Sequence, residues 1–107
     1  MAVDGEGIAE IAIDTALDPT GAAVVILAGE LDSSTAASLD AALAGILAER
    51  PNSVIFDLGE LQFMDSAGIA VLIGAAKASD VRLRNPSRIV RRVVEVTGLS
   101  HILPIEP

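Results

Sequence analysis

The chain has 107 residues, of which 51% are hydrophobic and only 2% aromatic, so intrinsic disorder is excluded and an aliphatic core is expected. It has no cysteine, which excludes disulfides, thiolate catalysis and cysteine-ligated metal centres. A formal net charge of −8 disfavours nucleic acid and anionic membranes as partners. The acidic start lacks the basic segment of a secretion signal, and no apolar run is long enough to span a bilayer. We expect a soluble, cytoplasmic protein with a single domain over residues 1–107.

The first predicted elements form a β-hairpin. Ile8, Ile11 and Ile13 lie in a strand-like stretch, and 18–21 (Asp-Pro-Thr-Gly) is a turn signal. The continuous apolar run 22–27 predicts a second strand that is buried on both faces.

A helix is expected next, capped by Ser33 or Ser34 and running to about residue 49, because apolar residues recur there at helical spacing. The segment 53–58 predicts another buried strand, and 66–78 predicts a nearly all-apolar helix.

The last third of the chain predicts a short strand over 81–83 and a helix from Pro86 to about Thr97. Asn85 is the expected N-cap, and Gly98 is well placed to end the helix. Four apolar residues of this helix are expected to face the core: Ile89, Val90, Val93 and Val96.

A final short edge strand over 102–105 is weakened by Pro104. Strands that alternate with helices after a hairpin predict a small α/β domain whose mixed, mostly parallel sheet has helices packed against it.

Polar residues follow the predicted strands. Because ligands and partners gather beyond the carboxyl ends of parallel strands, Asp32, Asp57, Asp65 and Ser66 are expected on one edge of the domain. The adjacent pair 63–64 (Phe-Met) is either core or an apolar patch on a surface that faces a partner.

Ser66 opens a predicted helix, where unpaired backbone N–H groups can accept an oxyanion such as phosphate. The commoner explanation on the residues alone is that Asp65 or Ser66 is only an N-cap. Asp32, Asp57 and Asp65 could likewise bind a divalent cation, but their spacing matches no dedicated metal loop, so solvated carboxylates are favoured.

Three other features give weaker signals. His101 is the only histidine and suits a surface position better than a catalytic base, and residues 68–77 lack the spacing of a phosphate loop. A late basic cluster is interpreted as a solvated helix face that can form salt bridges, in preference to a nucleic-acid site: Arg82, Arg84, Arg88, Arg91 and Arg92. No metal, cofactor or nucleic acid is therefore expected.

Two motifs carry a family resemblance. Residues 29–36 (GELDSSTA) resemble the G-E-L-D-x-x-T-A signature of the STAS family, the bacterial anti-sigma-factor antagonists. Residues 63–69 (FMDSAGI) are similar to that family's phosphorylation loop, F-M-D-S-[ST]-G-L, and residues 93–99 to its closing helix and G-L turn. The resemblance covers about residues 8–105, with departures at Ala67, where a second hydroxyl is common, and at Ala70, where glycine is usual.

The resemblance implies a regulatory binding protein without enzymatic activity. In such families an ATP-binding anti-sigma factor is also a serine kinase and phosphorylates the serine that follows the loop aspartate, here Ser66. The unphosphorylated antagonist binds that partner and frees a sigma factor, and a serine phosphatase resets the cycle. The expected partner-binding residues are those of the two motifs: Glu30, Asp32, Ser33, Thr35, Phe63, Met64, Asp65, Ala67, Gly68 and Ile69.

Alternatives stay open at this point. A STAS domain can also be a scaffold that does not switch, or an accessory subunit of a transporter, although such cousins often lack a usable serine. A two-component receiver phosphorylated on Asp57 would need an acidic pair after the first strand and a late lysine, but no lysine follows Lys77. An enzymatic function is less favoured still, because the sequence pairs no nucleophile with a general base.

Overall fold

The computed structural model describes residues 10–106, which form four strands, three α-helices and one short 3-10 helix. The elements are listed here in chain order: β1 (Ile11–Leu17), β2 (Ala23–Leu31), α1 (Ala36–Ala48), β3 (Val54–Met64), α2 (Ser66–Ala78), β4 (Val81–Arg84), α3 (Arg88–Val96) and η1 (Leu99–His101). The predicted hairpin is confirmed as β1 and β2, while Ile8 lies outside the described residues.

The sheet has the strand order β1-β2-β3-β4. The pair β1/β2 is antiparallel, and the pairs β2/β3 and β3/β4 are parallel. This confirms the predicted mixed, mostly parallel sheet. The last expected strand is reduced to a single parallel bridge between Leu83 and Ile105.

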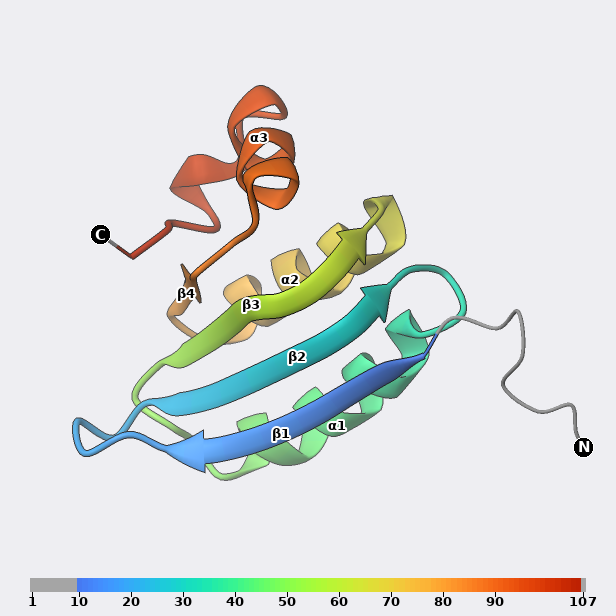
Figure 1. The fold of residues 1–107 in the computed structure, drawn as a ribbon. Helices are drawn as coiled ribbons and strands as arrows, with labels where there is room; N and C mark the ends of the chain where they lie inside the picture. The colour runs from blue at the N-terminus through green and yellow to red at the C-terminus, as the bar shows by residue number, and fades with distance from the viewer. Residues whose placement is uncertain (1–9, 107) are drawn as a thin grey trace, which may run out of the picture.

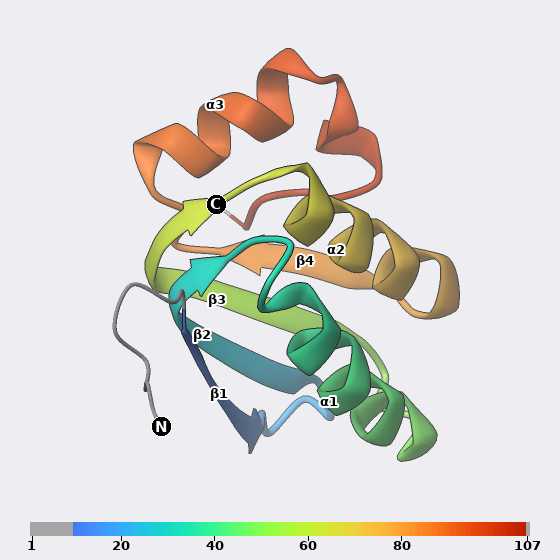
Figure 2. The same ribbon diagram turned by 90° about the vertical axis from the view of Figure 1, so that its right-hand side faces the viewer.

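Helices α1 and α2 lie side by side on one face of the sheet, and α3 lies beyond β4 (Figures 1 and 2). Between these helices and the sheet is a mainly aliphatic core, in which Phe56 is the largest fully buried side chain. Val90 of α3 and Leu103 of the C-terminal segment join the same core. Within residues 10–106, no helix is long and apolar enough to cross a membrane.

Strand β3 is longer than the segment 53–58 that the sequence predicts. Its pairing with β2 shifts register twice, and each shift places an extra β3 residue opposite β2, as β-bulges do. From the first shift onward the buried residues of β3 are three apart: Leu58, Leu61 and Met64. Because a regular strand alternates with a period of two, this spacing does not indicate a strand in the sequence.

Two helix caps also differ from expectation. The N-cap of α1 is Thr35, and neither Ser33 nor Ser34 holds that position. The N-cap of α3 is Ser87, whose hydroxyl accepts a hydrogen bond from Val90 N at 3.2 Å. Asn85, the predicted cap, instead adopts a left-handed conformation with φ of 55°, which asparagine tolerates better than most residues.

Helix α3 buries fewer residues than its sequence pattern predicts. Val90 and Val94 pack into the core, and Val93 is half-buried. Ile89 and Val96, which were also expected to face inward, are 70% and 74% exposed. Gly98, with φ of 75°, ends the helix as predicted.

Candidate functional site

The two sequence motifs meet at one edge of the sheet, where β2 and β3 both end. Glu30 pairs with Phe63 and Leu31 with Met64 in the parallel register. The backbone N–H of Asp65 then donates to the carbonyl of Leu31 at 3.1 Å, which ties the start of α2 to the end of β2. We call the gathered residues of both motifs the Ser66 edge: 30–35 together with 63–69.

Thr35 holds the first motif together from inside. Its side chain is only 4% exposed, and its hydroxyl donates to the carbonyl of Glu30 at 2.8 Å. The same oxygen accepts from the backbone N–H of Asp32 at 2.9 Å. Threonine stands in this motif because a single hydroxyl both donates and accepts, so two backbone groups are satisfied at the turn from β2 into α1.

The Asp32 carboxylate organises the outer side of the same turn. Its Oδ1 accepts from the Ser34 hydroxyl at 2.7 Å, from Ser34 N at 2.9 Å and from Thr35 N at 3.2 Å. These bonds stabilise the ionised form, and the Ser34 hydroxyl contributes most, so the pKa of Asp32 lies below its ordinary value. The serines that were expected to cap α1 thus belong to a turn built around Asp32.

Asp65 is the N-cap of α2. Its Oδ1 accepts from Ala67 N at 2.9 Å and from Gly68 N at 3.2 Å. A Cβ on Gly68 would lie 2.6 Å from Cγ of Leu31 and 3.0 Å from the Leu31 carbonyl oxygen. Only glycine lets the first turn of α2 approach β2 this closely.

Ser66 is the first residue of α2 and is exposed. Ser33, Ser34 and Phe63 are exposed too, Phe63 at 48%. The remaining accessible members of the Ser66 edge are half-buried: Glu30, Asp32, Asp65, Ala67 and Ile69. Thr35, Met64 and Gly68 are buried and shape the edge from beneath. The pair 63–64 is therefore divided between surface and core.

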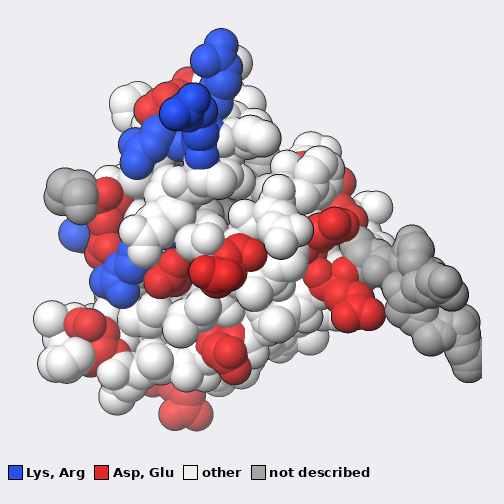
Figure 3. All heavy atoms as spheres, in the orientation of Figure 1, with Lys and Arg blue, Asp and Glu red and all other residues white. Residues whose placement is uncertain are grey.

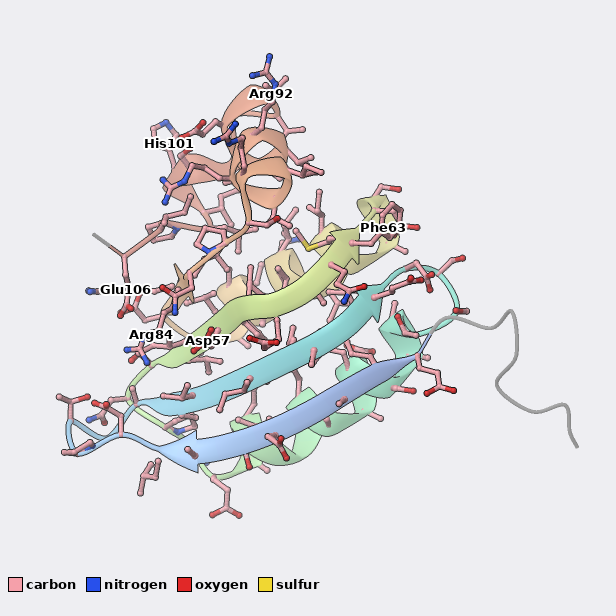
Figure 4. The ribbon with its side chains drawn as sticks, viewed as in Figure 1. Asp57, Phe63, Arg84, Arg92, His101 and Glu106 are labelled. Atoms are coloured by element: carbon pink, nitrogen blue, oxygen red, sulfur yellow. The ribbon has the colours of Figure 1, made fainter. Side chains whose placement is uncertain are left out.

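Asp57 does not lie on this edge, contrary to the sequence prediction. It pairs with Ile26 in β2 and with Arg84 in β4, whereas the Ser66 edge begins where Glu30 pairs with Phe63. Figure 4 shows Asp57 near Arg84 and Glu106, well away from Phe63 at the end of β3. The prediction failed because it placed the end of this strand at residue 58.

An exposed line of small residues runs along α2, a feature that the sequence analysis missed. Ser66, Ala70 and Gly74 are four residues apart and exposed, so they lie in one line along the helix. Beside this line is a shallow hollow of about 320 Å³ between α1 and α2, lined by Ala36, Ala37, Asp40, Ala70, Val71 and Gly74. The i, i+4, i+8 spacing of small residues was the available signal. A partner surface could approach both helices closely here.

The other candidate residues take no part in this edge. His101 is exposed in η1, and Arg84 forms a salt bridge with Glu106 at 2.7 Å, which raises the pKa of the guanidinium. Among residues 10–106, no group of three or more histidine, cysteine, aspartate or glutamate side chains could hold a metal ion.

The comparisons with known proteins agree with this architecture. The STAS domain model matches residues 15–107. The anti-sigma-F factor antagonist RsfB of Mycobacterium tuberculosis is 30% identical over 89 residues, which cover 79% of this chain and 73% of that protein. The anti-sigma-B factor antagonist of Listeria monocytogenes is 34% identical over 87 residues, which cover 77% and 76%.

A solved structure shows the same fold. The crystal structure of an anti-sigma factor antagonist from Mycobacterium paratuberculosis superposes with a TM-score of 0.82 at 26% identity, covering 92% of this chain and 86% of that one. The chain belongs to the STAS domain family, which confirms the family that its two motifs indicated.

Proposed function

We propose that this protein is an anti-sigma factor antagonist that is switched by phosphorylation of Ser66. The observation that carries the proposal is the exposed Ser66 hydroxyl at the first position of α2, on an edge where both family motifs meet. The antagonist relatives support the role. The protein would act by binding rather than by catalysis, and its cytoplasmic location stays a prediction.

The partner contacts would come from the accessible part of the Ser66 edge and from the small-residue face of α2. Phe63 offers an apolar contact, while Glu30, Asp32 and Asp65 offer carboxylates. The buried residues Thr35, Met64 and Gly68, which the sequence also assigned to the partner surface, would act by fixing its shape.

Phosphorylation would change this surface by charge alone. A phosphoryl group adds roughly −1.5 to −2 charges at pH 7. The Asp65 carboxylate already occupies the first N–H groups of α2, so the added charge would meet a carboxylate as well as the helix terminus. A partner surface that fits a neutral hydroxyl would have to desolvate a dianion. A change of about 1–3 kcal/mol in binding corresponds to one to two decades of affinity.

The test uses an anti-sigma factor with an ATP site as both kinase and ligand. Incubation with this protein and ATP should place phosphate on Ser66, and Ser66→Ala should abolish the modification while retaining binding. Ser66→Asp should bind at least about tenfold more weakly. Ser33→Ala is the matched control, because Ser33 is an exposed hydroxyl on the same edge outside α2.

Three outcomes would contradict the proposal in different ways. Equal binding by Ser66→Asp and the unmodified chain would indicate a scaffold or a transporter subunit that does not switch. Phosphate on Ser33 would show that the proposal names the wrong serine as the switch. Acid-labile phosphate on Asp57 would indicate a receiver, although Asp57 lies within β3 and not at the carboxyl end where receivers place their acceptor. Capture from lysate by the Ser66→Ala form but not by Ser66→Asp would identify the partner.

A further inference from the structure

Helix α3 carries two apolar stripes, and only one of them packs on the core. Val90 and Val94 are 2% and 0% exposed, whereas Ile89 and Val96 are 70% and 74% exposed. Residues 89, 93 and 96 follow the i, i+4, i+7 spacing, so they form one line along the helix. With Arg92 and Thr97 they line a shallow hollow of about 320 Å³. We call these residues the α3 stripe.

The charge around the α3 stripe differs in sign from the charge of the whole chain. Arg88, Arg91 and Arg92 are exposed, and Glu95 is the single acidic residue of the helix. In Figure 3 most lysine and arginine side chains gather over α3, with a second, smaller group near β4, while aspartate and glutamate side chains are scattered over the rest of that face. The net charge of the chain is −8. A complementary occupant must therefore bring apolar side chains and carboxylates together.

A second copy of the chain fits this description poorly. Pairing two α3 helices would bring the arginines of both copies together, with one glutamate in each helix to offset them. A helix of 9 residues is also only about 13 Å long, which matches a short partner helix better than the roughly 800 Å² per partner that a stable dimer buries.

An anionic membrane also fits poorly. The acidic side chains that Figure 3 shows elsewhere on the same face would be repelled by lipid headgroups of the same sign. The apolar residues of the stripe, Ile89, Val93 and Val96, are all aliphatic, so it lacks the aromatic side chains typical of interfacial helices. A short protein segment has the right size and chemistry.

We propose that the α3 stripe docks an amphipathic helix of a partner protein in which leucine or isoleucine residues are bordered by aspartate and glutamate. This is the helix-in-groove mode of recognition, with anchors at i, i+3, i+4 and i+7. Apolar contact gives affinity, and the arginines select an acidic partner over a basic one. The inference does not depend on the proposed role of Ser66.

The experiment uses the full chain, labelled with ¹⁵N, and two synthetic helical peptides as probes. One peptide has leucine at i, i+3, i+4 and i+7 bordered by glutamate, and the other has lysine in place of each glutamate. The glutamate peptide should shift the amide resonances of residues 89–97 and bind more weakly as salt rises. The lysine peptide should bind at least about tenfold more weakly.

Substitutions sharpen the assignment. Ile89→Gln and Val96→Gln should each weaken binding by about tenfold while the unfolding midpoint stays unchanged, because both side chains are exposed. Arg92→Gln should reduce binding and its salt dependence. The matched controls are Leu17→Gln, which removes another exposed aliphatic side chain at 77% exposure, and Arg82→Gln, which removes an exposed arginine outside α3.

Four results would overturn the proposal: equal binding of the two peptides, resonance shifts at residues 63–69 in place of 89–97, an equal loss from Leu17→Gln, or binding to anionic vesicles that the same variants weaken. A shift of the α3 resonances with protein concentration alone would assign the stripe to a second copy and would also overturn it.

Discussion

The Ser66 edge and the α3 stripe are two accessible surfaces built on opposite principles. At the edge, polar side chains bond to one another and to the backbone before any partner arrives, as Thr35, Asp32 and Asp65 do. On α3, long arginine side chains and bare aliphatic groups face solvent. Those bonds fix the first arrangement, so a single added charge would change its fit to a partner. The second must order its side chains on binding, so it depends on area and on charge of the correct sign.

The largest expected effect comes from shortening one residue in each of the two apolar stripes of α3. Val94→Ala should lower the free energy of unfolding by about 2–3 kcal/mol, because Val94 is fully buried in the core. Ile89→Ala should change it by less than about 0.5 kcal/mol. Urea denaturation measures both. Equal effects would mean that the stripe is packed inside the protein and is no surface.

A comparable test applies to the rigidity of the Ser66 edge. Thr35→Val keeps the shape of the side chain but removes the hydroxyl that joins Glu30 and Asp32. Two backbone groups then lose their partner, and the unfolding free energy should fall by about 1–3 kcal/mol.

Ser38→Ala is the control for Thr35→Val, since Ser38 is an exposed hydroxyl on α1. It should be nearly neutral. If Thr35→Val were as stable as the unmodified chain, the turn would not depend on this hydroxyl, and the edge would be less rigid than the geometry indicates.

The sequence predicted the fold better than it predicted the edge. The hairpin, helix α2 and the parallel pairing follow from local turn signals and periodicity, and the structure confirms them. The length of β3 does not follow from them, because its two bulges depend on pairing with β2. The position of Asp57 was wrong for the same reason.

The apolar residues of α3 show a related limit. Periodicity predicted that Ile89, Val90, Val93 and Val96 all face the core, but a helix can pack only part of so broad an apolar arc against it. Which part faces inward is decided by where β4 and the segment around Leu103 place the helix, and that is tertiary information. The sequence had no signal for it.

Two glycines of α2 give a smaller, paired test of how closely the edge is packed. Gly68→Ala would place a Cβ 2.6 Å from Leu31 Cγ, whereas a Cβ on Gly74 meets nothing within 4 Å. We expect Gly68→Ala to destabilise by about 1–2 kcal/mol and Gly74→Ala to stabilise by about 0.5–1 kcal/mol. Thermal or urea unfolding measures the change in stability of each variant. If both substitutions were stabilising, α2 would be able to move away from β2 at little cost.

The smallest expected effect comes from the protonation of Asp32 on the Ser66 edge. Hydrogen bonds from Ser34 and Thr35 lower the pKa of Asp32, so the ionised carboxylate is the form that holds the turn. The ionised carboxylate stabilises the turn fully above the ordinary aspartate pKa of about 3.9. This stabilisation is lost as the pH falls through the lower pKa that Asp32 has in the folded protein. The Ser34 and Thr35 amide resonances should therefore stay constant at neutral pH and move only below about pH 4. In Asp32→Asn the same resonances should not titrate in that range. If the resonances moved near pH 6, another titrating group would control the turn. If the titration were unchanged in Asp32→Asn, Asp32 would not be the group that organises it.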